Sequence, residues 1–375
     1  MLILRPPCDM SRTTDRRGGR DGSPRVVVVD DSPFMRGLIS DLLSDAGVAV
    51  VGEAGDGEEA LSVVAETRPD VVTMDVEMPG MGGLEAVERL MEETPTPVLM
   101  LSAHTDEGAE VTFEALDRGA VDFFAKPGGE VSTGVSRESD RLVEAVRSVA
   151  GADLDAATRE RDDPSGAGSR STGTAADPGA DAADVDEPLT VVIAASTGGP
   201  NAVERVLSAL PMADCRVVIV QHMPEAFTSR FADRLDAASA YDVREASDGA
   251  RIGAGEALVA RGGSHTVIDS YRAGRLRVKL DADDDTHTVT PAADVTMRSA
   301  AEVIDDPLVG VVLTGMGSDA AEGIRAMADA GARTLAQSED TCVIYGMPKR
   351  AVETGGVDAV YDLDDVAGAI VGGEA

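Results

Sequence analysis

Three side chains with complementary chemistry each follow an apolar segment in the C-terminal half of the sequence. Ser196 comes directly after LTVVIAA, His222 after RVVIVQ, and Asp319 soon after LVGVVLTG. If these segments are parallel strands, their carboxyl ends meet at one edge of a sheet and the three side chains can come together. A hydroxyl, an imidazole and a carboxylate in contact perform nucleophilic acyl transfer. The pattern therefore predicts Ser196 as nucleophile, His222 as the base and Asp319 as the acid that orients His222.

The residues after Ser196 suit the development of negative charge on a reacting oxygen. STGGPNAVERVLSAL turns directly into a helical pattern, and Gly198 and Gly199 leave space beside the hydroxyl for a bulky substrate. The N–H groups of a helix N-terminus favour an alkoxide or oxyanion. In TGMG, flexible glycines flank Met316, whose backbone N–H can be directed at the same point. A serine before two glycines is more often a turn or a helix cap, so these residues alone leave both interpretations open.

Two alternatives compete with this interpretation. His265, in ARGGSH, also follows an apolar segment and is a rival base. TGMGSDA fits the dinucleotide-binding pattern G-x-G-x-x-A, with Glu339 and Asp340 about 20 residues further on. That pattern lies in a late unit of the chain, and it places Asp319 where a pyrophosphate would be repelled. A nucleotide-binding or partner-binding module is therefore the less favoured interpretation of this half.

The N-terminal half carries a second cluster at the ends of its apolar segments. Asp30 and Asp31 follow VVVV, Asp75 follows VVTM, Ser102 ends PVLMLS and Lys126 follows VDFFA. Carboxylates held close together are unfavourable unless a cation lies among them, and oxygen ligands with room for water suit Mg²⁺. A metal-bound Asp75 can then accept a phosphoryl group whose oxygens are held by Lys126 and Ser102. Each aspartate alone would be explained as a helix cap, but their coincidence at one predicted edge favours the phosphorylation site.

The elements that must position these residues alternate between apolar strands and amphipathic helices in both halves. Alternating β and α units predict the α/β class, with two doubly wound parallel-sheet domains. We expect a disordered leader over 1–24, one domain over 25–145, a flexible acidic linker over 146–187 and a second domain over 188–375. The expected linker is rich in Ala, Asp, Gly, Ser, Thr and Pro, a composition that cannot bury enough apolar surface to fold.

The overall composition excludes several classes of partner. The formal net charge is −35, and only three of the 33 basic residues are lysines, so we expect no binding to nucleic acid or anionic lipid. Such an acidic chain suits a cytosol of molar salt, which we state as a hypothesis. The three scattered cysteines form no CxxC pair, and no apolar run is long enough to insert into a membrane. These features predict a cytoplasmic protein.

Residues 25–145 resemble the receiver domain of two-component response regulators, which has a flavodoxin-like fold. The segments that carry the resemblance are VVVVDDS, MDVEMPGMGG, LSA and FFAKP. The resemblance implies phosphorylation of Asp75 by a histidine kinase, and Mg²⁺ held by Asp30, Asp31, Asp75 and the Glu77 carbonyl. It also implies that Ser102 and Phe123, with Lys126, form the switch that responds to phosphorylation.

Residues 188–371 resemble the catalytic domain of the chemotaxis protein-glutamate methylesterases, the CheB family, which is Rossmann-like. The segments are AASTGGP, QHMPEAFTSRFADRL, GGSH, TPAADVTMRSAA, GVVLTGMGSDAAEG and IYGMPKRA. Carried over by position, the family roles fall on Ser196, His222 and Asp319, with Thr197 and Met316 as supports near the oxyanion. Arg261 departs from the proline usual in the family.

The two resemblances together imply a phosphorylation-activated enzyme of sensory adaptation. Its expected substrates are glutamate methyl esters on chemoreceptors, with methanol as a product, and the same acyl chemistry implies deamidation of receptor glutamines. The expected partners are a chemotaxis histidine kinase and methyl-accepting chemoreceptors. Mg²⁺ is expected in the receiver alone, and no cofactor is expected for the ester step.

Overall fold

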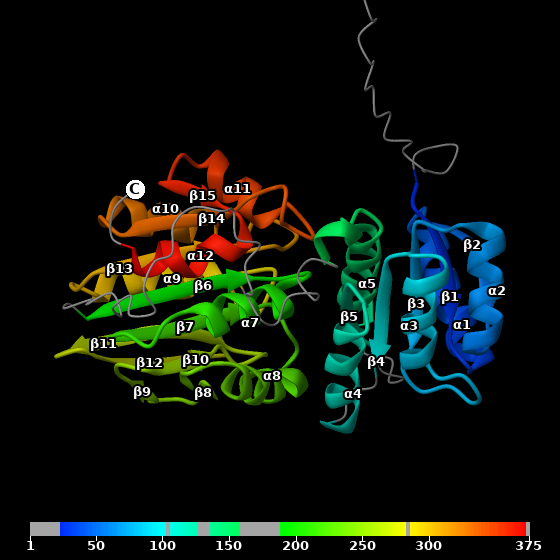
Figure 1. Ribbon diagram of the computed structural model, residues 1–375, viewed down its shortest axis with the longest axis horizontal. Coiled ribbons are helices and arrows are strands. Elements are labelled where there is room, and N and C mark those ends of the chain that lie inside the picture. The colour runs from blue at the N-terminus through cyan, green and yellow to red at the C-terminus, as the bar shows by residue number, and fades with distance from the viewer. Residues whose placement is uncertain (1–22, 103–105, 127–134, 158–187, 283–285, 373–375) are drawn as a thin grey trace, which may run out of the picture.

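The computed structural model describes residues 23–102, 106–126, 135–157, 188–282 and 286–372 (Figure 1). The described chain forms two α/β units, each built on a parallel sheet. This confirms the predicted fold class. Most of the expected leader and linker lies outside the described residues. No helix in the described ranges is both long enough and apolar enough to cross a membrane.

The N-terminal unit is a five-stranded parallel sheet with strand order β2-β1-β3-β4-β5. Its strands are β1 (Arg25–Val29), β2 (Ala49–Ala54), β3 (Val71–Asp75), β4 (Val98–Ser102) and β5 (Asp122–Ala125). Its helices are α1 (Pro33–Asp45), α2 (Gly57–Thr67), α3 (Gly83–Glu93), α4 (Asp106–Asp117) and α5 (Val135–Val149). Alternate strand residues face opposite sides, so one core packs under α1 and α5 and the other under α2, α3 and α4.

Helix α5 extends past the boundary that the sequence suggested between domain and linker. Val146 and Val149 are fully buried in the core beneath this helix, whereas the expected linker began at 146. The helix is so rich in polar residues that its few apolar positions gave a weak signal. The first unit therefore includes at least the four residues that complete α5.

The C-terminal unit has a seven-stranded parallel sheet with strand order β15-β14-β13-β6-β7-β10-β8. Its strands are β6 (Leu189–Ala195), β7 (Cys215–Gln221), β8 (Asp242–Glu245), β10 (Glu256–Val259), β13 (Leu308–Val312), β14 (Arg333–Gln337) and β15 (Ala359–Tyr361). The strand order reverses at β6, which has β7 on one side and β13 on the other. Such a reversal opens a crevice at the carboxyl ends of the strands, where ligands bind in sheets of this kind.

Helices cover both faces of this larger sheet. One core packs under α7 (Gly199–Ala209), α8 (Glu225–Ala238) and α12 (Leu363–Val371). The other packs under α9 (Ala293–Val303), α10 (Ala321–Asp329) and α11 (Met347–Glu353). Because the sheet is covered on both sides, its central strands β6 and β13 are almost wholly apolar.

A small antiparallel sheet lies beside this unit and was not predicted. It consists of β9 (Arg251–Ile252), β11 (His265–Arg272) and β12 (Arg275–Asp281). Strands β11 and β12 form a hairpin whose turn, Ala273–Gly274, has positive φ at both residues (49° and 74°). The second turn residue is a glycine, which adopts this conformation without strain. The alternating segment HTVIDSYRAGRLRVKLD carried this signal in the sequence.

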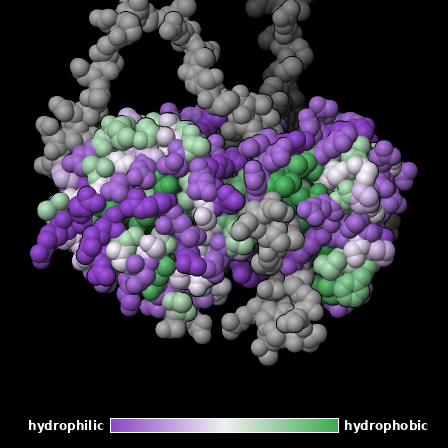
Figure 2. All heavy atoms as spheres, turned by 90° about the horizontal axis from the view of Figure 1, so that it is seen from below, coloured by the Kyte–Doolittle hydropathy of each residue, from purple (hydrophilic) through white to green (hydrophobic). Residues whose placement is uncertain are grey.

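The two units are in contact through the side of the first that carries β5, α4 and α5 (Figure 1). The Phe113 and Phe231 rings stack with centroids 6.0 Å apart, and the Phe123 ring lies 4.6 Å from that of Phe227. Arg234 of α8 reaches across to the Asp117 carboxylate, with Nη2 2.7 Å from Oδ1. Elsewhere the surface is dominated by hydrophilic residues, with apolar residues in separate patches on the face that Figure 2 shows.

Candidate active site

Ser196 lies at the carboxyl end of β6, in the tight turn that leads into α7. Its backbone N–H donates to the Thr314 carbonyl (3.1 Å), and its carbonyl accepts from the Gly199 N–H (2.7 Å). Gly198 has φ 75°, a conformation that favours glycine. A Cβ on Gly199 would lie 2.8 Å from the Ala195 Cβ and still closer to the Gln221 side chain. The two glycines are therefore required by the turn itself and by what packs against it.

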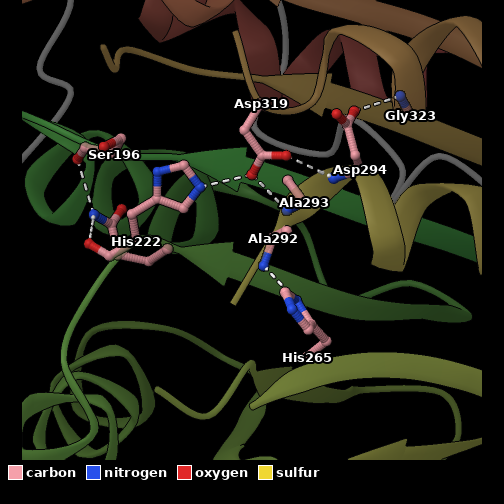
Figure 3. Close-up of polar contacts among 9 residues, drawn as sticks. Ser196, His222, His265, Ala292, Ala293, Asp294, Asp319 and Gly323 are labelled. Atoms are coloured by element: carbon pink, nitrogen blue, oxygen red, sulfur yellow. Dashed lines mark hydrogen bonds and ion pairs between the residues drawn. The ribbon is translucent and has the colours of Figure 1, made fainter. Parts of the chain in front are cut away.

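His222 lies at the end of the neighbouring strand β7 and is hydrogen-bonded to Asp319. His222 Nε2 is 2.7 Å from Asp319 Oδ2, and both side chains are largely buried (Figure 3). The His222 backbone N–H donates to the Ala195 carbonyl (3.0 Å), which ties this residue to the end of β6. The edge of the sheet thus places Ser196, His222 and Asp319 around one cavity.

Asp319 is held as a carboxylate by donors on two sides. Its Oδ2 accepts the Ala293 N–H (2.6 Å) and its Oδ1 the Asp294 N–H (3.0 Å), both at the N-terminus of α9. Burial alone would raise the pKa of Asp319, but the hydrogen bond and charge of His222 and the two backbone donors lower this pKa to about 2. A permanently ionised carboxylate can orient an imidazole and stabilise its protonated form.

The three side chains open into a cavity of about 370 Å³. Thr197 and Met316 line the same cavity, next to Ser196 and Asp319. No hydrogen bond joins the Ser196 hydroxyl to the His222 ring among the described residues. Because Nε2 is engaged by Asp319, the free Nδ1 is the atom available to a nucleophile, and such contacts often tighten only when substrate binds.

The two alternatives, His265 as the base and a dinucleotide site at TGMG, involve residues near the same edge of the sheet. His265 is fully buried, and its Nδ1 accepts the Ala292 N–H (3.0 Å) on the far side of Asp319 from Ser196 (Figure 3). It does not line the cavity. A Cβ on Gly315 would lie 2.8 Å from the Ser196 Cβ, so this glycine of the TGMG segment makes room for the serine. Neither observation favours a second base or a dinucleotide.

The receiver residues form a separate cluster at the end of the first sheet. Ligand atoms of Asp30, Asp31 and Asp75 lie within 4.8 Å of one another. Lys126 Nζ is 2.8 Å from Asp30 Oδ2 and 2.7 Å from Asp75 Oδ2. Burial raises the pKa of Asp75, and Lys126 opposes that effect. The three converging carboxylates fit a hard divalent cation with oxygen ligands.

Of the other residues that the resemblance singled out, Ser102 and Glu77 lie near this cluster and Phe123 packs elsewhere. Ser102 is fully buried at the end of β4, beside the strand that carries Asp75. The Glu77 N–H lies 3.4 Å from Asp75 Oδ1, which places the Glu77 backbone at the cluster. Phe123, by contrast, packs against Phe227 of the other unit. This aromatic side chain therefore belongs to the contact between the units.

The N-terminal unit also lines the cavity. Asp122 and Phe123 of β5 and Arg141 and Glu144 of α5 lie around it, opposite the carboxyl edge of the larger sheet. Burial raises the pKa of Asp122 to about 7, although its carboxylate accepts the Phe123 N–H (2.9 Å) and lies beside the Thr197 side chain. Sequence analysis missed Asp122, because nothing in a local pattern shows which surface of one domain faces another.

Comparisons with known proteins agree with both halves of this description. Residues 26–132 match the response regulator receiver domain, and residues 191–370 match the CheB methylesterase family. A protein-glutamate methylesterase/protein-glutamine glutaminase of Haloarcula marismortui is 58% identical over 361 residues, covering 92% of this chain and 96% of the relative. Its Halobacterium salinarum counterpart is 55% identical over 346 residues, covering 92% and 97%. The crystal structure of the Thermotoga maritima CheB methylesterase catalytic domain is 35% identical, with a TM-score of 0.47, and covers 49% of this chain and 97% of that one.

Proposed function

This chain belongs to the protein-glutamate methylesterase/protein-glutamine glutaminase family, and we propose that Ser196, His222 and Asp319 carry out its ester hydrolysis. The observation that supports this most directly is the His222–Asp319 pair beside Ser196 in one cavity. No other described cluster in the C-terminal unit combines a nucleophile, a base and an ionised partner for that base.

The first half of the reaction forms an acyl-enzyme. The Ser196 oxygen attacks the carbonyl carbon of a glutamate methyl ester while His222 takes the hydroxyl proton. The oxygen of the tetrahedral intermediate is negative, and backbone donors at Thr197 and Met316 are the groups that we assign to it. Donors of this kind typically contribute about 10²- to 10³-fold to kcat. As the intermediate collapses, His222 returns its proton to the leaving methoxide, and methanol departs.

The second half restores the enzyme. Water attacks the acyl carbon while His222 takes one of its protons, and His222 returns that proton to the Ser196 oxygen as it leaves. The glutamate side chain is released as a carboxylic acid, which ionises in water. Asp319 stabilises the imidazolium in both halves, because its carboxylate stays ionised. The deamidation of glutamine follows the same steps with ammonia as the leaving group. The substrates that we propose are glutamyl esters and glutamines on the helices of methyl-accepting chemoreceptors.

We assign the control of this reaction to the receiver. Asp75 is the proposed acceptor of a phosphoryl group from a histidine kinase. Asp30, Asp31, Asp75 and the Glu77 carbonyl would hold Mg²⁺, which neutralises charge on the transferring phosphoryl group. Lys126 already bridges two of these carboxylates and can hold a phosphate oxygen, as can the Ser102 hydroxyl.

The proposed mechanism of control is steric. The side of the receiver that carries Asp122 and Phe123 lines the cavity that holds Ser196, so a receptor helix cannot enter while the two units are in contact. Phosphorylation of Asp75 would loosen that contact. The contact includes both aromatic pairs and the Arg234–Asp117 ion pair, so its strength can be altered by single substitutions.

The test is methanol release from receptor-containing membranes whose glutamates carry labelled methyl esters. The wild-type chain with a phosphodonor should release labelled methanol, and Ser196→Ala should release none above background. A serine-directed phosphonate should label Ser196 in the wild type only. Ser208→Ala, at an exposed serine of α7 that bonds only to the Arg205 carbonyl, is a matched control. Release by Ser196→Ala at the wild-type rate would refute the assignment of the nucleophile.

A further inference from the structure

Gln221 is a buried amide that contacts the main chain of both the nucleophile and the base. It is the last residue of β7 and is 1% exposed. Its Nε2 donates to the Ser196 carbonyl (2.8 Å) and lies 3.2 Å from the His222 carbonyl. One amide therefore bridges the two residues between which the proton must pass.

The Gln221 side chain makes these contacts at the point where the backbone hydrogen bonds between β6 and β7 end. Strands β6 and β7 pair in register as far as Ala195 and Gln221, and the His222 N–H makes the last backbone bond, to Ala195. Beyond that point Ser196 turns toward α7 and is no longer paired with β7 through its backbone. The Gln221 side chain supplies the next connection between the two strand ends.

The surrounding chain makes room for this side chain. A Cβ on Gly199 would clash with Gln221 Oε1, so the glycine at the start of α7 preserves the space that the amide occupies. Oε1 itself has no hydrogen-bond partner among the described residues, although it is buried. An unpaired buried carbonyl oxygen destabilises the fold, so the Oε1 atom does not explain why an amide occupies this position. The N–H₂ group does, because it makes the two contacts to the main chain. Glutamate would lack that donor, and methionine would match the length without it.

We propose that Gln221 is a positioning residue for the esterase step, which fixes the relative placement of Ser196 and His222 without touching substrate. This inference rests on the proposed catalytic roles of those two residues. Loss of the bridge frees the turn at Ser196 relative to the end of β7. Displacements of about 1 Å in a catalytic group can lower kcat by about 10²-fold. Substrate binding should be far less affected, because Gln221 does not line the cavity.

The test compares Gln221→Met with wild type in the full chain with a phosphodonor. We expect kcat for methanol release to fall about 10- to 100-fold while KM changes by less than about twofold. The rate of phosphonate labelling at Ser196 should fall in parallel. Thr334→Val is the matched control, because it removes buried contacts to Asp358 at the opposite end of the sheet. It should lower Tm comparably and leave kcat unchanged.

Two results would overturn the proposal. The first is a kcat for Gln221→Met equal to that of wild type. The second is a loss of kcat that Thr334→Val reproduces at the same Tm. If Gln221→Met does not fold, Gln221→Asn keeps the donors but shortens their reach, and it should show the same selective loss of kcat. A wild-type chain that neither releases methanol nor reacts with the phosphonate would instead refute the catalytic assignment itself.

Discussion

Asp122 offers a way to measure the contact between receiver and catalytic edge. Its carboxylate lies beside the Thr197 side chain across the contact, and burial raises its pKa from 3.8 to about 7. Release of the receiver returns the carboxylate to water. The proposed docking therefore favours the protonated form of Asp122, and the strength of docking should depend on pH.

The sign and size of the effect follow from linkage. Below pH 3.8 the Asp122 carboxyl is protonated whether or not the receiver is docked, so it does not oppose docking. As the pH rises from 3.8 toward 7, the released carboxyl loses its proton and the docked one keeps it, so the free energy of docking becomes less favourable. Docking is weakest above pH 7. The full shift would correspond to about 4 kcal/mol, at about 1.4 kcal/mol for each pKa unit. Because the Asp122 side chain keeps some contact with solvent, we expect about 1–2 kcal/mol. That is a change of about 5- to 30-fold in the ratio of docked to released receiver.

The perturbation is Asp122→Asn, which keeps an acceptor for Thr197 and removes the titration. At a pH of about 8, basal methanol release without phosphodonor should be about 5- to 30-fold lower in this variant than in wild type. The ratio of the two rates should approach one as the pH is lowered. The esterase residues are the same in both proteins, so their own pH dependence cancels in that ratio.

Asp117→Asn is the matched control at the same contact. It removes an exposed carboxylate that pairs with Arg234, so it should weaken docking and raise basal activity, the opposite direction. Equal basal rates for Asp122→Asn and wild type at high pH would refute the reasoning. So would a ratio that does not vary with pH.

Three further predictions concern the catalytic acid, the phosphorylation site and the surface charge. Asp319→Asn should lower kcat by about 10⁴-fold in the methanol assay, because the imidazolium loses its carboxylate partner; a loss below tenfold would contradict the assigned role. Asp75→Asn should abolish activation by a phosphodonor and leave basal methanol release intact, and activation that persists would place the phosphoryl group elsewhere. Urea unfolding should show a higher midpoint in molar KCl than in dilute buffer, since a net charge of −35 repels itself until the screening length falls to about 3 Å; full stability in dilute buffer would contradict this.

The sequence analysis succeeded where chemistry is carried by residues at strand ends. A buried parallel strand is almost wholly apolar, so a polar side chain directly after it stands out, and the topology of a wound sheet brings such positions to one edge. For this reason Ser196, His222 and Asp319 could be grouped without coordinates, and so could Asp30, Asp75 and Lys126. The confirmed α/β class rests on the same alternation of strands and helices.

The antiparallel hairpin and the end of α5 were harder to predict. The hairpin of β11 and β12 alternates polar and apolar residues over a short span, which is a weaker signal than a buried strand. Val146 and Val149 lie in a segment dominated by charged residues, so their burial depends on what α5 packs against.

The sequence by itself determined the two α/β units, the residues at their strand ends and the chemistry that those residue types can perform. These features depend on local patterns and on the connectivity of parallel sheets. Only the tertiary structure decided that Gln221 bridges Ser196 and His222, that the N-terminus of α9 holds Asp319, and that Asp122 meets Thr197 across the contact between units. Each of these contacts joins groups that different elements place by packing, and packing distances are not encoded in the spacing of residues along the chain.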